Sequence, residues 1–431
     1  MAIFELAKVI RTVSGADVKI TAYLGSGKRH DVYSVDYNNQ TKILVWYKDG
    51  IIRETKESLR VILESHIKMK NPNDAFLWPI EMVVDGEDFG YIVDLRSSEY
   101  RSASEILEFE GKFISEKDIV DACMKVANAF NALSEQGLGY QDLNLKNIYI
   151  NSEGEVLINY LDNVLPIGAV PTCGSLKFTA PELCKRETNR ISEGTVAYAF
   201  SVLVFMLLFR HHPLEGARWL VPFLTDDVNR DIYIDNPVFI FDENNDSNAP
   251  SPYVQKRVTE VWRSMPLYAQ NFFKDAFSKD SFIDDTNRAS LKEWLVFLAR
   301  LRNDIVKCNC GNEVIIKNNS SADCKKCGHA VNVEFVLALS DFRIAIHKGT
   351  RVYKCLLGKL DSREAAETAL VVAPRADAPN VFGIKNVTDD VVNAITPSGS
   401  EKAVERQSLI PIMDGIALNV YDTTINIKKK T

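Results

Sequence analysis

Four of the eight cysteines in the chain cluster between positions 308 and 327. Cys308 and Cys310 form a Cys-x-Cys pair, Cys324 and Cys327 form a Cys-x-x-Cys pair, and a glycine follows each pair. Four thiolates at such spacing suit tetrahedral zinc, and a filled tetrahedron favours a structural role over a catalytic one. The clustering therefore predicts a zinc ribbon and indicates a reducing compartment in which disulfides do not form.

A nucleic-acid-binding ribbon is the alternative interpretation, because Lys325 and Lys326 lie inside the second pair. The formal net charge of −7 opposes it and gives no general attraction to nucleic acid or anionic membranes. The longest apolar run, Val196 to Phe209, is too short to span a bilayer and predicts a buried helix. No basic segment followed by an apolar run opens the chain, so we expect a cytoplasmic protein without membrane or nucleic-acid partners.

A polar loop that follows an apolar-rich run carries Asp142 and Asn147, and two short predicted strands come after it. This stretch resembles the catalytic loop of protein kinases, where an aspartate takes the substrate proton and an asparagine holds magnesium. The resemblance assigns these roles to Asp142 and Asn147. The family's magnesium-binding aspartate falls on Tyr160, whose phenol is a poor ligand for a hard dication. Asp162 is the expected substitute, on the same face if the strand continues.

A Gly-rich hairpin is predicted between Ile20 and Val35. Its Gly25, Gly27 and Val32 match positions at which kinases hold nucleotide. A Gly-x-Gly hairpin is more often a simple tight turn, but its position about one kinase lobe ahead of the Asp142 loop favours the kinase interpretation. The family's phosphate-binding lysine aligns with Val45. Lys48 is the candidate replacement, but strand alternation turns it to the opposite side from Val45, so we favour a solvated strand-end lysine.

Helical periodicity predicts helices over Arg53 to Lys68 and Ser115 to Gln136. Glu57 or Glu64 of the first helix is the expected partner of a lysine, and His66 is expected to pack in its apolar stripe. Ala180-Pro181-Glu182 resembles the kinase motif that closes the activation segment, which implies a buried ion pair between Glu182 and Arg288. The helix aspartate of active kinases aligns with Val196.

Further segments resemble a bacterial kinase-like subfamily found with von Willebrand A proteins and metal-dependent phosphatases in tellurite-resistance-associated (TerY-type) gene clusters. They are Asn236 to Asp242, Ser247 to Pro250, Trp262 with Met265-Pro266, and Arg288 to Trp294. The resemblance covers roughly residues 15 to 302 of 431. It implies phosphatase or von Willebrand A partners.

From Val331 onward, short alternating runs separated by Gly, Pro, Asn and Asp predict a β-sandwich. Phe382 to Asn386 and Pro397-Ser398-Gly399 resemble forkhead-associated (FHA) domains, without the Ser-x-x-His loop of that family. We therefore expect an α+β chain. Its predicted parts are a bilobal kinase-like domain (1–303, lobes meeting at 95/96), a zinc ribbon (304–330) and an FHA-like sandwich (331–431).

Two functions compete. Active kinases rely on charged side chains at three positions that are uncharged here, namely Val45, Tyr160 and Val196. Their loss favours a pseudokinase that acts as a binding scaffold. The alternative is an atypical Ser/Thr kinase that binds ATP and magnesium, with Asp142 as base, Asn147 and Asp162 on the metal, and Lys48 on phosphate.

Overall fold

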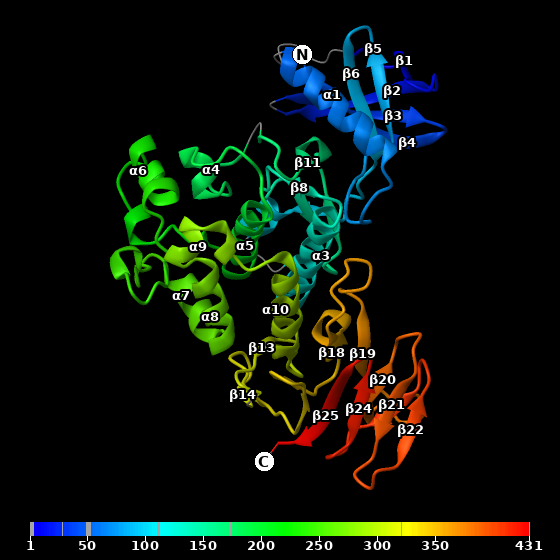
Figure 1. Cartoon of the computed structure of the whole chain (residues 1–431), viewed down its shortest axis with the longest axis vertical. Coiled ribbons are helices and arrows are strands. Elements are labelled where there is room, and N and C mark those ends of the chain that lie inside the picture. Colours follow the sequence, from blue (N-terminus) through cyan, green and yellow to red (C-terminus); the bar gives the residue numbers. More distant parts are fainter. Residues whose placement is uncertain are drawn as a thin grey trace.

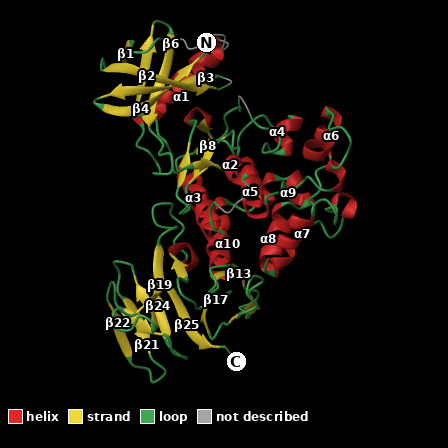
Figure 2. Ribbon diagram, turned by 180° about the vertical axis from the view of Figure 1, so that it is seen from behind, coloured by secondary structure: helices red, strands yellow, loops and turns green. Residues whose placement is uncertain are grey.

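The computed structural model describes residues 4–27, 29–48, 53–109, 113–171, 174–319 and 321–430. Figure 1 shows three regions along the long axis: a strand-rich end, a helical middle and two β-sheets at the opposite end. Figure 2 shows the same layers from behind, with helices confined mainly to the middle. The prediction of a mixed helix and strand chain that ends in an all-β region is confirmed.

Six antiparallel strands close into a barrel at the N-terminal end. They are β1 (Val9–Thr12), β2 (Asp17–Ser26), β3 (His30–Tyr37), β4 (Gln40–Tyr47), β5 (Glu81–Asp85) and β6 (Asp88–Asp94), in the order β1-β2-β3-β4-β6-β5. Alternation along β4 puts Trp46 in the barrel interior, whereas Val45 and Tyr47 face outward. Helix α1 (Arg53–Lys68), with the predicted bounds, covers that outer face with Leu59 and Leu63.

The middle region is built around α5 (Glu193–Phe209), which is buried on all sides as its apolar sequence requires. The other helices are α2 (Ala103–Glu108), α3 (Glu116–Ser134), α4 (Pro181–Lys185), α6 (Asp226–Arg230), α7 (Lys256–Ser264), α8 (Leu267–Ala276), α9 (Lys279–Ile283) and α10 (Leu291–Asp304). Within the described part of the chain, no helix is long and apolar enough to cross a membrane. Helix α3 packs against both α5 and α10.

Two small sheets carry the segment from Leu138 to Pro166. The first pairs β8 (Leu138–Tyr140) with β11 (Val164–Pro166), and the second joins β7 (Arg101–Ser102), β9 (Ile148–Ile150) and β10 (Val156–Ile158). Ile158 exchanges backbone hydrogen bonds with the chain that leaves α1: its N–H donates to Ala75 O (2.7 Å) and its carbonyl accepts from Leu77 N–H (3.0 Å). The loop that carries Asp142 is thereby fixed beneath the barrel.

The cysteine-rich segment follows α10 without a linker, because α10 ends at Asp304 and β12 (Ile305–Lys307) begins at the next residue. It contains two short hairpins: β12 pairs with β13 (Glu313–Ile315), and β14 (Ala322–Asp323) pairs with β15 (Ala330–Val331). In Figure 1 the segment lies at the lower end of α10.

The C-terminal region consists of two antiparallel sheets. The six-stranded sheet has the order β17-β16-β25-β24-β21-β22, and the four-stranded sheet has the order β18-β19-β20-β23. Their strands are β16 (Phe335–Ala338), β17 (Arg343–Ala345), β18 (Arg351–Tyr353), β19 (Thr368–Pro374), β20 (Phe382–Asn386), β21 (Val392–Ile395), β22 (Glu401–Val404), β23 (Leu409–Pro411), β24 (Ala417–Val420) and β25 (Thr423–Lys429). Leu337, Leu370 and Ile425 contribute to one core between the sheets.

This C-terminal region is joined to the helical region by a continuous apolar core and by buried hydrogen bonds. Asn303 of α10 is fully buried, and its amide bonds both backbone groups of Arg351: Nδ2 donates to the carbonyl (2.7 Å) and Oδ1 accepts from the N–H (2.9 Å). At the end of α3, Glu135 accepts from Ser362 N–H (3.1 Å) and Oγ–H (2.6 Å). The two regions therefore form a common folded body.

Candidate functional site

The loop after β8 is folded around the carbonyl of Asp142. The side-chain amides of Asn147 (3.0 Å) and Asn144 (3.2 Å) both donate to that carbonyl, and Asn147 is only 5% exposed. The Asp142 carboxyl group is half-buried, and burial raises its pKa. The Asn147 side-chain nitrogen is therefore committed to holding the loop.

The strand that should have continued to Asp162 ends earlier than predicted. Strand β10 stops at Ile158, and Tyr160 adopts a left-handed backbone conformation (φ 57°). The following 3₁₀ turn, η1 (Leu161–Asn163), buries Asp162 to 3% exposure. The expected alternation of Tyr160 and Asp162 along one strand face is therefore wrong, because the backbone reverses at Tyr160.

A contact between two aromatic rings, His30 and Tyr160, joins the tip of the Gly-rich hairpin to this turn. His30, at the start of β3, packs against Tyr160 with the ring centroids 4.7 Å apart. A Cβ atom on Gly27 would approach the His30 ring to 3.2 Å, so the small residue at position 27 makes room for the imidazole. Burial lowers the pKa of His30, which favours its neutral form.

Two tyrosines lie close enough to Asp162 to feel its charge. The hydroxyls of Tyr47 and Tyr91 are buried, and burial, followed by the charge of Asp162, raises their pKa values far above the usual range. In the described ranges, the Tyr91 hydroxyl, Asp162 Oδ1 and His30 Nδ1 have no hydrogen-bond partner, whereas the Tyr47 hydroxyl is near enough to Asp162 for a hydrogen bond with it to contribute to its pKa shift. Each orphaned buried polar group costs about 1–3 kcal/mol, so the space around Asp162 is poised to accept hydrogen bonds or to donate them.

This donor set does not fit magnesium-bound ATP. Magnesium needs ionised or carbonyl oxygens in near-octahedral array, but the side chains that feel the charge of Asp162 include two phenols, Tyr47 and Tyr91, and the imidazole of His30. The second carboxylate expected of such a site is replaced by Tyr160, whose ring is occupied by the contact with His30. We therefore derive no phosphoryl-transfer step through this cleft.

Lys48 lies just beyond β4 and folds back onto the hairpin. Its Nζ donates to Gly27 O (2.7 Å) and lies 3.8 Å from Asp31 Oδ1. Neither expected helix partner contacts it: Glu57 is exposed, and Glu64 pairs with Arg60. The prediction that α1 supplies a carboxylate for the lysine is wrong, because α1 packs on the outer face of β4 and Lys48 extends on the opposite side.

The remaining nucleotide-binding candidates are structural parts of the barrel. Val32 and Gly25 are paired across β2 and β3, and Val32 is paired with Val45 across β3 and β4. Val45 is 1% exposed and belongs to the apolar cluster under α1. The aligned lysine position is thus filled by a buried aliphatic side chain.

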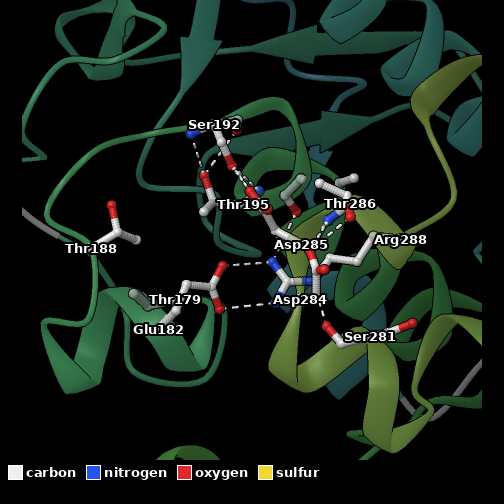
Figure 3. A network of polar contacts seen from close by, with 12 residues as sticks. Thr179, Glu182, Thr188, Ser192, Thr195, Ser281, Asp284, Asp285, Thr286 and Arg288 are labelled. Carbon is white, nitrogen blue, oxygen red and sulfur yellow. Dashed lines mark hydrogen bonds and ion pairs between the residues drawn. The ribbon is translucent and has the colours of Figure 1, made fainter.

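A bidentate ion pair ties α4 to the segment before α10. Arg288 donates from both terminal nitrogens to the two oxygens of Glu182, at 2.7 and 2.8 Å, as Figure 3 shows. Arg288 also donates to the carbonyls of Ser281 (2.8 Å) and Gly194 (3.1 Å). The pairing of Glu182 with Arg288 is confirmed, and its burial makes it expensive to break.

The four predicted cysteines come together as one cluster. Cys308 and Cys327 have sulfurs 3.6 Å apart, as do Cys310 and Cys324, and all four sulfurs lie within 4.8 Å of one another. Zinc–sulfur bonds of about 2.3 Å imply a sulfur–sulfur distance of about 3.8 Å in a tetrahedron. The cysteines thus fit a metal such as zinc.

The backbone around the cluster supports this geometry. Gly311 and Gly328 have positive φ values (84° and 72°) and donate backbone hydrogen bonds to Cys308 O and Cys324 O, 2.8 Å each. Asn312 Nδ2 lies 3.6 Å from Cys324 Sγ and would orient that thiolate. With four sulfurs filling the tetrahedron, a metal held here would have no open coordination position and would serve a structural role.

Comparisons with known proteins give a limited match. No family model matches the chain. A probable serine/threonine-protein kinase of Dictyostelium discoideum is 36% identical over 86 residues, which is 19% of this chain and 12% of that protein. The chain thus spans about an eighth of the length of this curated relative. The similarity is compatible with a kinase-like segment and does not assign a family.

Several residues near Asp162 were not among the predicted site residues. Tyr47 and Tyr91 face Asp162, and His30 covers Tyr160. The period-two alternation of β4 placed Tyr47 on the same face as Val45, so this signal was available. No sequence signal reveals the His30–Tyr160 contact, because it joins segments from two regions of the fold.

Proposed function

We propose that the chain has a degenerate protein-kinase-like fold and works as a pseudokinase, that is, as a binding scaffold and not as a phosphotransferase. The observation that carries this proposal is a ring contact: His30 packs on Tyr160, and both side chains lie close enough to the buried Asp162 to feel its charge. In phosphoryl transfer, magnesium and a lysine supply most of the stabilisation of developing charge. Here Tyr160 and Val45 stand at those two positions.

The elements that an intact large lobe needs are retained. Glu182 and Arg288 are paired, α5 is fully buried, and Trp294 is completely enclosed. Val196, at the third altered position, packs against Gly139 of β8, where an added Cβ would lie 3.0 Å from Val196 Cγ2. The packing of the fold is kept, while uncharged residues occupy the three positions at which active kinases carry charged side chains. This combination supports a protein that binds partners and does not transfer phosphate.

The partners proposed are a metal-dependent phosphatase or a von Willebrand A protein, as the resemblance to TerY-type clusters implies. Fold-level analogy alone supports this choice. The C-terminal sheets, proposed as an FHA-like sandwich, offer a second binding surface. A cytoplasmic location is part of the same proposal, because a four-cysteine metal site is typical of a reducing compartment.

The test is a thermal-shift titration of the full chain with ATP, with and without magnesium. A ligand at about a hundred times its dissociation constant stabilises a protein by roughly 2.7 kcal/mol, which such a scan detects. We expect no magnesium-dependent shift. The matched variants are Asp162→Asn in the cleft and Asp36→Asn on the exposed side of β3. A magnesium-dependent shift that only Asp162→Asn removes would contradict the proposal.

An atypical Ser/Thr kinase is the second candidate, and the observation that favours it is the raised pKa of Asp142, as a general base requires. Its metal would rest on Asn147 and Asp162 and its phosphate contact on Lys48. Phosphate transfer to a generic protein substrate that Asp142→Ala abolishes would establish this candidate and exclude the scaffold.

A further inference from the structure

An apolar surface of the helical region is left uncovered between two loops. The loop from Trp219 to α6 exposes Leu220, Val221, Phe223 and Leu224, and Phe223 is 82% exposed. The loop before α7 exposes Tyr253 (92%) and Val254 (71%). Clusters of exposed large apolar side chains on a folded protein mark interaction surfaces more often than chance.

A pocket of about 220 Å³ opens between the two loops. Its floor is rigid: Phe209 and Val258 are buried in the main core, and Phe209 packs on Trp262 at 5.9 Å. Gln255, also in the floor, donates to Glu215 O (2.6 Å) and accepts from Ser251 N–H (2.9 Å). A preformed pocket of this size accommodates one aromatic or large aliphatic side chain.

The charged side chains that line the pocket are all basic. Arg210 and Arg257 line it together with His211, and no carboxylate does. Arg210 is anchored by donation to Phe109 O (3.2 Å), and its pKa is lowered by burial and then by the charge of Arg257. Arg257 is exposed, and within the described ranges it makes no hydrogen bond or ion pair. A local cationic pair on a chain of net charge −7 selects for an acidic ligand.

We infer that this pocket, with Leu220, Val254 and Arg257 at its rim, docks a segment of a partner protein in which a large apolar side chain is flanked by carboxylates. The apolar side chain enters the pocket, and the carboxylates meet Arg257 and Arg210. At protein interfaces, a central buried apolar side chain usually supplies most of the affinity, and the charges around it supply specificity. The inference deepens the proposed scaffold function and rests on it.

The test uses fluorescence anisotropy of a labelled short peptide with one phenylalanine between pairs of glutamates, added to the full chain. Its twin carries lysines in place of the glutamates. We expect the acidic peptide to bind at least about tenfold more tightly than its twin, with affinity that falls as salt rises. Arg257→Glu and Val254→Ser should each weaken binding by about tenfold.

The matched controls are Arg343→Glu and Ile283→Ser, which change an exposed arginine and an exposed isoleucine (68%) elsewhere. They should leave binding unchanged. Equal binding of both peptides, no binding of either, or equal loss in the controls would overturn the inference. Self-association that Val254→Ser abolishes would identify a second copy as the occupant and also overturn it.

These experiments test the docking pocket and the proposed function separately. A magnesium-dependent ATP shift with peptide discrimination intact contradicts the proposed function alone. Loss of discrimination with no nucleotide shift contradicts the docking pocket alone.

Discussion

Two buried histidines should make the stability of this protein sensitive to mild acid. His66 and His212 are 3% and 1% exposed, and burial lowers the pKa of each from 6.5 to about 4. Between these pH values the unfolded chain binds more protons than the folded protein. The free energy of unfolding therefore falls as the pH is lowered from 6.5 toward 4, and the full contribution is present above 6.5.

We predict that His66→Phe removes its share of this pH dependence. His66 Nδ1 has no partner in the described part of the chain, and its ring packs on Trp78 at 5.2 Å, so phenylalanine keeps the contact and adds no orphaned atom. At pH 4.5 the variant should retain about 2 to 3 kcal/mol more of its neutral-pH stability than the wild type. Urea unfolding across pH measures this.

The exposed His329 provides the control, and His329→Gln should follow the wild-type profile. An unchanged slope in His66→Phe would mean that the imidazole is hydrated in the folded protein. The packing role predicted for His66 from its place in the apolar stripe is confirmed by the structure.

Among the secondary-structure elements, the cysteine-rich hairpin and α3 are directly linked. Glu313 of β13 accepts hydrogen bonds from the N–H groups of Glu116 (2.9 Å) and Lys117 (3.3 Å), the first residues of α3. A carboxylate at a helix N-terminus satisfies orphan donors and interacts favourably with the helix dipole. The cysteine-rich hairpin thereby supports the helix that leads to the Asp142 loop.

We predict about one zinc per chain and its loss in Cys324→Ser, because binding energy in such clusters is folding energy. Hydrogen exchange should accelerate at residues 305–331 and also at Glu116 and Lys117, since the Glu313 contact loosens with the hairpin. Metal analysis and exchange measured by mass spectrometry report both effects. Cys184→Ser, outside the cluster, should retain zinc and protection. Zinc retained in Cys324→Ser would contradict the four-sulfur site.

Features set by residues close together in the sequence were predicted, whereas contacts between residues far apart in the sequence were not. Helical periodicity located α1 and α3, an apolar run located most of α5, and the Cys-x-Cys and Cys-x-x-Cys spacing identified the four cysteines, because each of these signals lies within a short stretch of sequence. The Glu313 contact joins residues 197 positions apart, and the His30–Tyr160 contact depends on the reversal at Tyr160. Neither leaves a periodic pattern. Tertiary contacts of this kind could not be predicted from one sequence.

Over the whole molecule, the C-terminal sheets and the helical region should unfold together. Asn303 is fully buried and bonds both backbone groups of Arg351, and the apolar core is continuous across the same boundary. Removing one buried hydrogen-bonding partner leaves the others unsatisfied. Deletion of residues 332–431 would expose this core, so point variants test the C-terminal surface more cleanly than truncation does.

We predict that Asn303→Ala lowers the free energy of unfolding by about 2–4 kcal/mol and keeps a single cooperative transition. All five tryptophans precede Asn303, so fluorescence follows the barrel and helices, while hydrogen exchange in β18 and β24 follows the sheets. The two probes should report the same midpoint. The control is Asn393→Ala, whose side chain is exposed on β21. Separate midpoints in the wild type would show that the regions fold independently.

The position of β25 has a consequence for synthesis on the ribosome. This strand, Thr423–Lys429, lies inside the six-stranded sheet between β16 and β24. Until it has left the exit tunnel, β16 and β24 lack the neighbour that joins them, and the sheet core that supports α10 cannot close. The barrel can form as soon as it is translated, but the helical region has to wait with apolar surface exposed. Chaperone dependence during translation should therefore fall on the middle of this chain.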